Sequence, residues 1–159
     1  MTGRLLAGGI LLLALASCDP DRVYEEKLDY PGRHWMVKDT AHFSFRLDND
    51  QLRYNLKMDL RNSLEYPWSR IFVEMRLADS TGAVVERKLI HADLFDEKTG
   101  QPFGQSGLGD VFDHRVPLLE NYSFRYPGAY RLTLIQMMRK DTLEGVLSVG
   151  ARLERVQTP

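Results

Sequence analysis

Most of the side chains that could do chemistry lie in one long segment, His91 to Leu118, which is rich in glycine and charge. Its densest part reads Gly-Leu-Gly-Asp-Val-Phe-Asp-His-Arg over residues 107–115. These residues could bind a metal ion, contact a partner or brace a loop; they are Asp110, Asp113, His114 and Arg115. We favour bracing, because Arg115 can pair with Asp110 or Asp113 while both carboxylates accept backbone N–H groups.

Metal and catalytic chemistry are only weakly indicated. Asp110, Asp113 and His114 are nearly consecutive, with no second histidine at helical spacing, and the acidic residues of 93–97 do not follow EF-hand spacing. No serine lies in a Gly-x-Ser-x-Gly elbow. We therefore expect no metal, no cofactor and no small-molecule substrate. Paired carboxylates that hydrolyse a glycosidic bond stay open as an alternative, because the separation of Asp and Glu side chains is set by the fold.

Composition narrows the class of protein further. The chain has 159 residues, 43% of them hydrophobic, which is enough for one domain with a core. Lys and Arg total 21 against 22 Asp and Glu, so the balance argues against a nucleic-acid partner. A single cysteine excludes an internal disulfide and any cysteine-based zinc ribbon.

That cysteine is explained by the N-terminal sequence. Arg4 precedes an apolar run over residues 5–15 that is too short to span a bilayer comfortably, and Leu-Ala-Ser-Cys follows, ending at Cys18. A small residue before cysteine at this place is typical of cleavage by a lipoprotein signal peptidase. The sequence predicts a signal peptide over 1–17 and fatty chains such as palmitate on Cys18, which would hold the protein at a membrane. The alternative is an ordinary secretory signal that leaves Cys18 free.

Residues 18–32 are polar, contain two prolines and lack a sustained apolar period, so we interpret them as a lipidated tether. The alternative is an N-terminal edge strand that would use Val23, Tyr24, Leu28 and Tyr30. The folded domain is expected over 33–159.

Alternation of apolar and polar residues dominates that domain. In residues 52–61, Leu, Tyr, Leu, Met and Leu face one way while charged and amide side chains face the other, as in a half-buried strand. Similar patterns or β-prone runs occur at 42–47, 71–77, 83–90, 122–125, 130–138 and 147–156. We predict an all-β fold, an antiparallel β-sandwich of the immunoglobulin-like or jelly-roll kind with about seven to eight strands.

Aromatic residues offer a second functional interpretation. Trp35, Tyr66, Trp68 and Tyr122 could stack on sugar rings of a glycan or of peptidoglycan, although filling the core is the favoured role. Trp68 follows a proline in a turn between two strands, where a large ring is expected to be partly exposed and available to a partner.

Four motifs occur along the chain: residues 107–115, Tyr-Pro-Trp at 66–68, Gln-Met-Met-Arg at 136–139 and Val-Gly-Ala-Arg-Leu-Glu at 149–154. Together they resemble the GldH family of gliding-motility lipoproteins from the Bacteroidota. The likeness runs from about Tyr24 to Arg155. It implies a non-enzymatic lipoprotein that supports gliding and type IX protein secretion through contacts with envelope proteins, and it carries over only Cys18. We expect attachment to the outer membrane. The protein should face the periplasm, because Asp-Pro-Asp at 19–21 is a poor signal for export to the cell surface.

Overall fold

The computed structural model describes residues 19–157 as β-strands joined by turns and loops, with no helix in that range. None of these residues therefore forms a helix with the length and hydropathy of a membrane span. The strands are β1 (Arg22–Asp29), β2 (His34–Met36), β3 (Ala41–Leu47), β4 (Tyr54–Ser63), β5 (Arg70–Ala78), β6 (Val84–Asp93), β7 (Gln105–Ser106), β8 (Val111–Tyr122), β9 (Gly128–Gln136), β10 (Thr142–Glu144) and β11 (Val146–Arg155). Cys18 and the predicted signal peptide lie outside the described residues.

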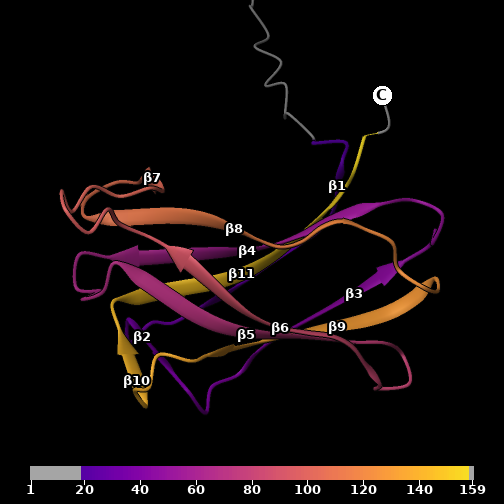
Figure 1. Cartoon of the computed structure of the whole chain (residues 1–159), viewed down its shortest axis with the longest axis horizontal. Coiled ribbons are helices and arrows are strands. Elements are labelled where there is room, and N and C mark those ends of the chain that lie inside the picture. Colours follow the sequence, from indigo (N-terminus) through magenta and orange to yellow (C-terminus); the bar gives the residue numbers. More distant parts are fainter. Residues whose placement is uncertain (1–18, 158–159) are drawn as a thin grey trace, which may run out of the picture.

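The strands form two main antiparallel sheets and one small one. The first sheet has the order β1-β11-β4-β8-β7 and the second has the order β3-β9-β5-β6, while β10 and β2 pair alone. Figure 1 shows the two main sheets layered one on the other, with the β10-β2 pair at one end. The predicted all-β sandwich is therefore confirmed, with more strands than the seven to eight expected.

The alternation of apolar and polar residues explains why these segments form strands. Along β3, buried and exposed side chains alternate without a break, and the same pattern holds through most of β4 and β9. The inward side chains interdigitate between the sheets as in other sandwiches. The largest fully buried side chains are Trp35, Phe43, Leu47, Leu56, Met58, Leu60, Ile71, Met75, Leu77, Leu94, Leu132 and Leu134. Each such burial stabilises the fold by about 1.5–3 kcal/mol.

The segment interpreted as a tether is instead largely a strand. β1 pairs antiparallel with β11, from Arg22 opposite Glu154 to Asp29 opposite Ser148. Tyr24 reaches β3 on the other sheet, with its ring centroid 5.5 Å from that of Phe45. The edge-strand alternative therefore describes this segment. Most side chains of β1 are exposed, so the sequence carries little apolar period there.

The long loop predicted from His91 to Leu118 is shorter than expected. β6 continues to Asp93 and β8 begins at Val111, which leaves residues 94–110, here called the arm. β7 pairs the arm to β8, and an isolated bridge joins Phe95 to Pro102. The predicted strand at 122–125 is wrong, because β8 ends at its first residue and the chain turns there.

Candidate functional site

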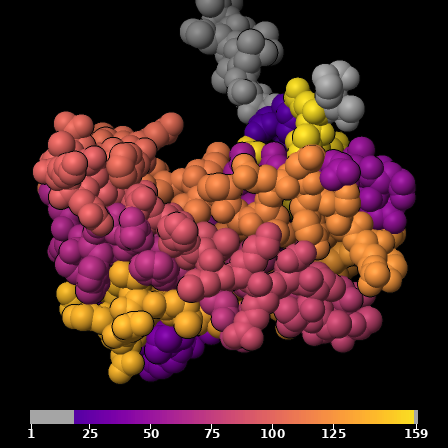
Figure 2. Space-filling view, in the orientation of Figure 1, coloured from indigo at the N-terminus to yellow at the C-terminus, as the bar shows by residue number. Residues whose placement is uncertain are grey.

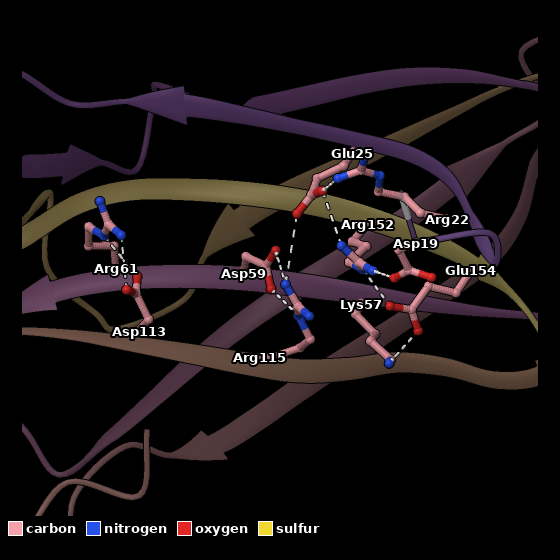
Figure 3. A network of polar contacts seen from close by, with 10 residues as sticks. All are labelled: Asp19, Arg22, Glu25, Lys57, Asp59, Arg61, Asp113, Arg115, Arg152 and Glu154. Carbon is pink, nitrogen blue, oxygen red and sulfur yellow. Dashed lines mark hydrogen bonds and ion pairs between the residues drawn. The ribbon is translucent and has the colours of Figure 1, made fainter. Parts of the chain in front are cut away.

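The outer face of the five-stranded sheet carries many charged side chains at facing positions of neighbouring strands. The register aligns Glu25 with Arg152 and Lys57 in one row, and Arg61 with Asp113 in another. We call this set the charged face (Figure 3); it comprises Asp19, Arg22, Glu25, Lys57, Asp59, Arg61, Asp113, Arg115, Arg152 and Glu154. Arg152 and Lys57 face each other across β11 and β4, and Glu154 contacts both of them, so most charges meet an opposite one.

Two arginine–carboxylate pairs join β4 to β8. Arg61 donates to both oxygens of Asp113 at 2.8 and 2.9 Å, and Arg115 donates to both oxygens of Asp59 at 2.7 and 3.1 Å. The expected pairing of Arg115 with Asp110 or Asp113 is therefore wrong. Asp113 and Arg115 lie two residues apart on a strand, so each meets its cross-strand neighbour rather than the other.

Asp110 lies apart from these pairs, at the end of the arm. Its backbone carbonyl accepts a hydrogen bond from the Leu64 N–H at 3.2 Å, which ties the arm to the turn after β4. The four residues expected to act together are thus divided. Asp113 and Arg115 join strands, whereas Asp110 and His114 hold the arm.

Arg152 is the centre of the charged face. Its side chain is 9% exposed and contacts three carboxylates, those of Asp19, Glu25 and Glu154. Burial acts to raise the pKa of Glu154, but hydrogen bonds from Lys57 and Arg152 outweigh it and hold that pKa below its ordinary 4.5. Figure 3 shows Asp19, the first described residue, directed at the Arg152 guanidinium.

A polar groove of about 440 Å³ lies between the charged face and the arm. Its lining includes Lys27, Arg61 and Arg115 from the sheet and Phe103 and Gly104 from the arm. Figure 2 shows the arm standing out from one end of the molecule. The carboxylates Asp59 and Asp113 already accept from arginines, and residues 19–157 hold no cluster of ligand side chains suited to a metal ion. The arrangement is that of a structural brace beside a polar groove.

The His114 side chain packs against the arm. It is buried against Phe95 of the arm, with ring centroids 5.9 Å apart, and Gly104 lies directly over it. A Cβ atom at Gly104 would come within 2.3 Å of the Asp113 carbonyl and 2.6 Å of His114 Nδ1, so only glycine fits there. Within the described residues, His114 Nε2 is buried without a hydrogen-bond partner. Burial lowers the pKa of His114 below its ordinary 6.5, although the charge of Asp113 opposes this effect.

The burial of His114 predicts a pH-dependent stability. Because the folded protein favours the neutral imidazole, the unfolded chain binds this proton more readily, so stability is complete above about pH 6.5 and falls as the pH drops below that value. We expect the free energy of unfolding in urea to decrease between about pH 7.5 and pH 5.5. A His114→Phe variant should show a flatter dependence over the same range, and an unchanged slope would contradict this role.

The aromatic residues considered for sugar stacking do not form a platform. Trp35 and Tyr66 are buried, and their polar atoms donate to the backbone carbonyls of Asp39 and Arg70, each at 2.8 Å. Trp68 is partly buried against the core, and Lys140 Nζ lies 5.4 Å from the centre of its ring. The favoured core role therefore describes Trp35 and Tyr66, and Trp68 is only partly accessible.

Sequence reasoning missed an apolar surface on the outer face of the second sheet, here called the apolar patch. It consists of Phe72, Leu89, Met137 and Met138, and it borders a hollow of about 440 Å³ that also includes Arg139. Leu89 is 62% exposed and Met137 is 44% exposed. The signal was present in the Gln-Met-Met-Arg motif, but the outward direction of these side chains depends on where β9 ends.

Comparison with known proteins agrees with the resemblance noted in the sequence. The family model described as GldH lipoprotein matches residues 22–153. A protein of Christiangramia forsetii named gliding motility lipoprotein GldH homolog is 31% identical over 156 residues, which cover 91% of this chain and 90% of that protein. The gliding motility lipoprotein GldH of Flavobacterium johnsoniae is 27% identical over 165 residues, 96% of this chain and 98% of its own length.

Among solved structures, the VP2 subviral particle of infectious bursal disease virus aligns with 97% of this chain and 43% of its own, at 14% identity. Its TM-score of 0.39 is too low to support a conclusion about fold or function. The family match, in contrast, extends from the start of β1 into β11 and includes the arm, the apolar patch and all of the charged face except Asp19 and Glu154. This chain therefore belongs to the GldH lipoprotein family.

Proposed function

We propose that this chain is a non-enzymatic, lipid-anchored protein of the outer membrane that supports gliding motility and the associated type IX secretion machinery. The observation that carries the proposal is the family match over residues 22–153, since its relatives are named gliding motility lipoproteins. Fatty chains on Cys18 supply the anchor, and the protein faces the periplasm. It acts by contact with other envelope proteins.

The apolar patch supports this mode of action. Leu89 and Met137 are exposed to solvent, and the partly buried side chains of Phe72 and Met138 lie beside them, next to Arg139. Aromatic residues, Met and Arg are the residues in which the centres of protein interfaces are enriched. Exposed apolar patches are a feature of surfaces that bind proteins or membranes, and we assign this one to a partner protein. The charged face suits this role less well, because its charges are largely paired with each other.

Deletion and complementation in the host organism test this proposal. We expect deletion to abolish export of surface adhesins and, where the host glides, spreading on a surface; the wild-type chain should restore both. Leu89→Glu should fail to restore them although it leaves the fold intact, since substitution of a largely exposed residue changes stability by only about 0.5 kcal/mol.

Val84→Glu is the matched control, because Val84 lies on the same strand, is 55% exposed and is outside the apolar patch. It should restore export as the wild type does. Normal export of adhesins in the deletion strain would contradict the proposed function. Full restoration by Leu89→Glu would instead remove only the role of the apolar patch.

A further inference from the structure

The fold leaves almost no free chain between its body and residue 18. Asp19 binds Arg152, its carbonyl accepts from the Arg22 N–H at 3.3 Å, and β1 begins at Arg22. Neighbouring Cα atoms are about 3.8 Å apart across a trans peptide bond. Fatty chains on Cys18 would therefore start next to the folded body, so that the body must lie against the membrane rather than hang from a tether.

The arm lies on the same side of the molecule as this first described residue. Figure 1 shows β1's N-terminal end and the arm around β7 both on the side of the five-stranded sheet, while the sheet containing β5 and β9 lies on the other side. Figure 2 shows the same arrangement, with a lower surface between the arm and the start of the chain. A flat membrane surface on this side of the molecule would contact both the arm and the N-terminal end of β1.

The tip of the arm has the chemistry of a membrane contact. Leu108 is 99% exposed and Phe103 is 64% exposed, the two largest values among the exposed large hydrophobic residues of the described chain. No charged residue occurs from Thr99 to Gly109, whereas 27% of the whole chain is charged. Glycines flank Leu108 on both sides, and Gly109 has φ +73°, so no neighbouring side chain covers the leucine.

The arm is held firmly enough to present this tip. Phe95 packs edge-on against Phe112 with ring centroids 5.3 Å apart, and β7 pairs with β8. Asp96 accepts hydrogen bonds from the N–H groups of Lys98 and Thr99 at 2.9 and 2.7 Å, which closes the turn within the arm. Such contacts fix the arm without burying Leu108.

We propose that Phe103 and Leu108 rest in the surface of the same lipid bilayer that receives the anchor, so that the body meets the membrane at two points. The inference depends on the proposed lipidation of Cys18. The fatty chains hold the protein at the bilayer, and a second apolar contact adds to this attachment and fixes the orientation of the body. In that orientation the apolar patch, on the opposite sheet, points away from the bilayer and stays open to a partner.

Site-specific spin labels test the contact. The mature chain has no cysteine other than Cys18, so Leu108→Cys provides a single free thiol once the Cys18 sulfur is acylated. We would label this variant with a nitroxide, reconstitute the lipidated protein in phosphatidylethanolamine vesicles, and measure collisions with oxygen and with a water-soluble nickel chelate. Leu89→Cys, 62% exposed on the other sheet, is the matched control.

We expect the label at 108 to show a several-fold higher ratio of oxygen to nickel collisions than the label at 89. Equal ratios typical of water at both positions would overturn the contact. The mass of the same protein shows whether Cys18 carries its fatty chains. If the protein is lipidated but both labels are in water, only the arm contact is wrong. If Cys18 carries no lipid, both the proposed anchor and this inference are wrong.

Discussion

A Gly145→Ala variant is expected to lose about 2–5 kcal/mol of unfolding free energy, the sum of left-handed backbone strain and steric overlap. Gly145 joins β10 to β11 with φ +78°. A Cβ atom there would lie 2.2 Å from the Tyr66 nitrogen and 2.6 Å from its Cα. These are backbone atoms, so no side-chain rotation relieves the overlap.

The hydrogen bonds of Gly145 prevent the backbone from moving aside. Its N–H donates to the Arg33 carbonyl at 2.8 Å, and its carbonyl accepts from the Ser63 N–H at 2.9 Å. Small domains unfold at a cost of only about 5–15 kcal/mol, so the variant should unfold at a much lower urea concentration or fail to accumulate.

Gly82→Ala is the control for the backbone strain alone. Gly82 has φ +85° in the turn between β5 and β6, and nothing lies within 4 Å of the place its Cβ would occupy. It should lose about 1–2 kcal/mol, measured by urea denaturation of both variants. Equal losses at the two glycines would show that the contact with Tyr66 has no effect.

Arg152→Ala is the second change with a large expected effect. Removing this nearly buried guanidinium leaves three carboxylates near one another without their shared partner. We expect a loss of about 2–4 kcal/mol, below the range for fully buried pairs because Asp19 and Glu25 are partly exposed. Thermal or urea unfolding measures it.

Arg115→Ala provides the comparison, because Arg115 makes an equally well-formed pair but its side chain is 47% exposed. It should lose about 1 kcal/mol or less. If Arg115→Ala loses as much unfolding free energy as Arg152→Ala, burial does not determine how strongly these ion pairs stabilise the fold.

The Arg152→Ala substitution should also change how the free energy of unfolding depends on pH. A carboxylate whose folded pKa lies below its unfolded value stabilises the fold above the unfolded pKa, and this stability is lost as the pH falls through the folded pKa. Glu25 and Glu154 both have a pKa below the ordinary 4.5, with hydrogen bonds and charges of Arg152 among the causes. The wild type should therefore weaken as the pH falls below 4.5, and Arg152→Ala should weaken less over that range.

The sequence predicted β3, β4, β5, β6, β9 and β11 close to their observed bounds. In β3, β4, β9 and most of β5, one face is buried and the other is wetter, and local sequence displays this alternation directly. β6 is mostly exposed and β11 is mostly buried, although both were predicted as well. β2, β7 and β10 have two or three residues each and are defined only by their partners. β1 is exposed along most of its length, so its strand depends on the free edge of β11 rather than on its own pattern.

The site was predicted in part. The sequence identified Asp113, His114 and Arg115 as important, but it assigned them to a loop and paired them locally. Their partners Arg61 and Asp59 lie more than fifty residues away, and only the register of β4 against β8 brings them together. Exposure of Leu89 and Leu108 likewise depends on tertiary packing, which local sequence does not specify.

The Asp19–Arg152 ion pair has a mechanical consequence if the anchor carries load as the cell moves. Tension on the anchor would enter the fold at the start of β1, where this ion pair is the first contact to bear it. Pulling along the strand would shear the β1–β11 ladder as a unit, whereas pulling across it would peel the ladder open from Arg22. The direction of traction would then decide whether the body holds or unravels.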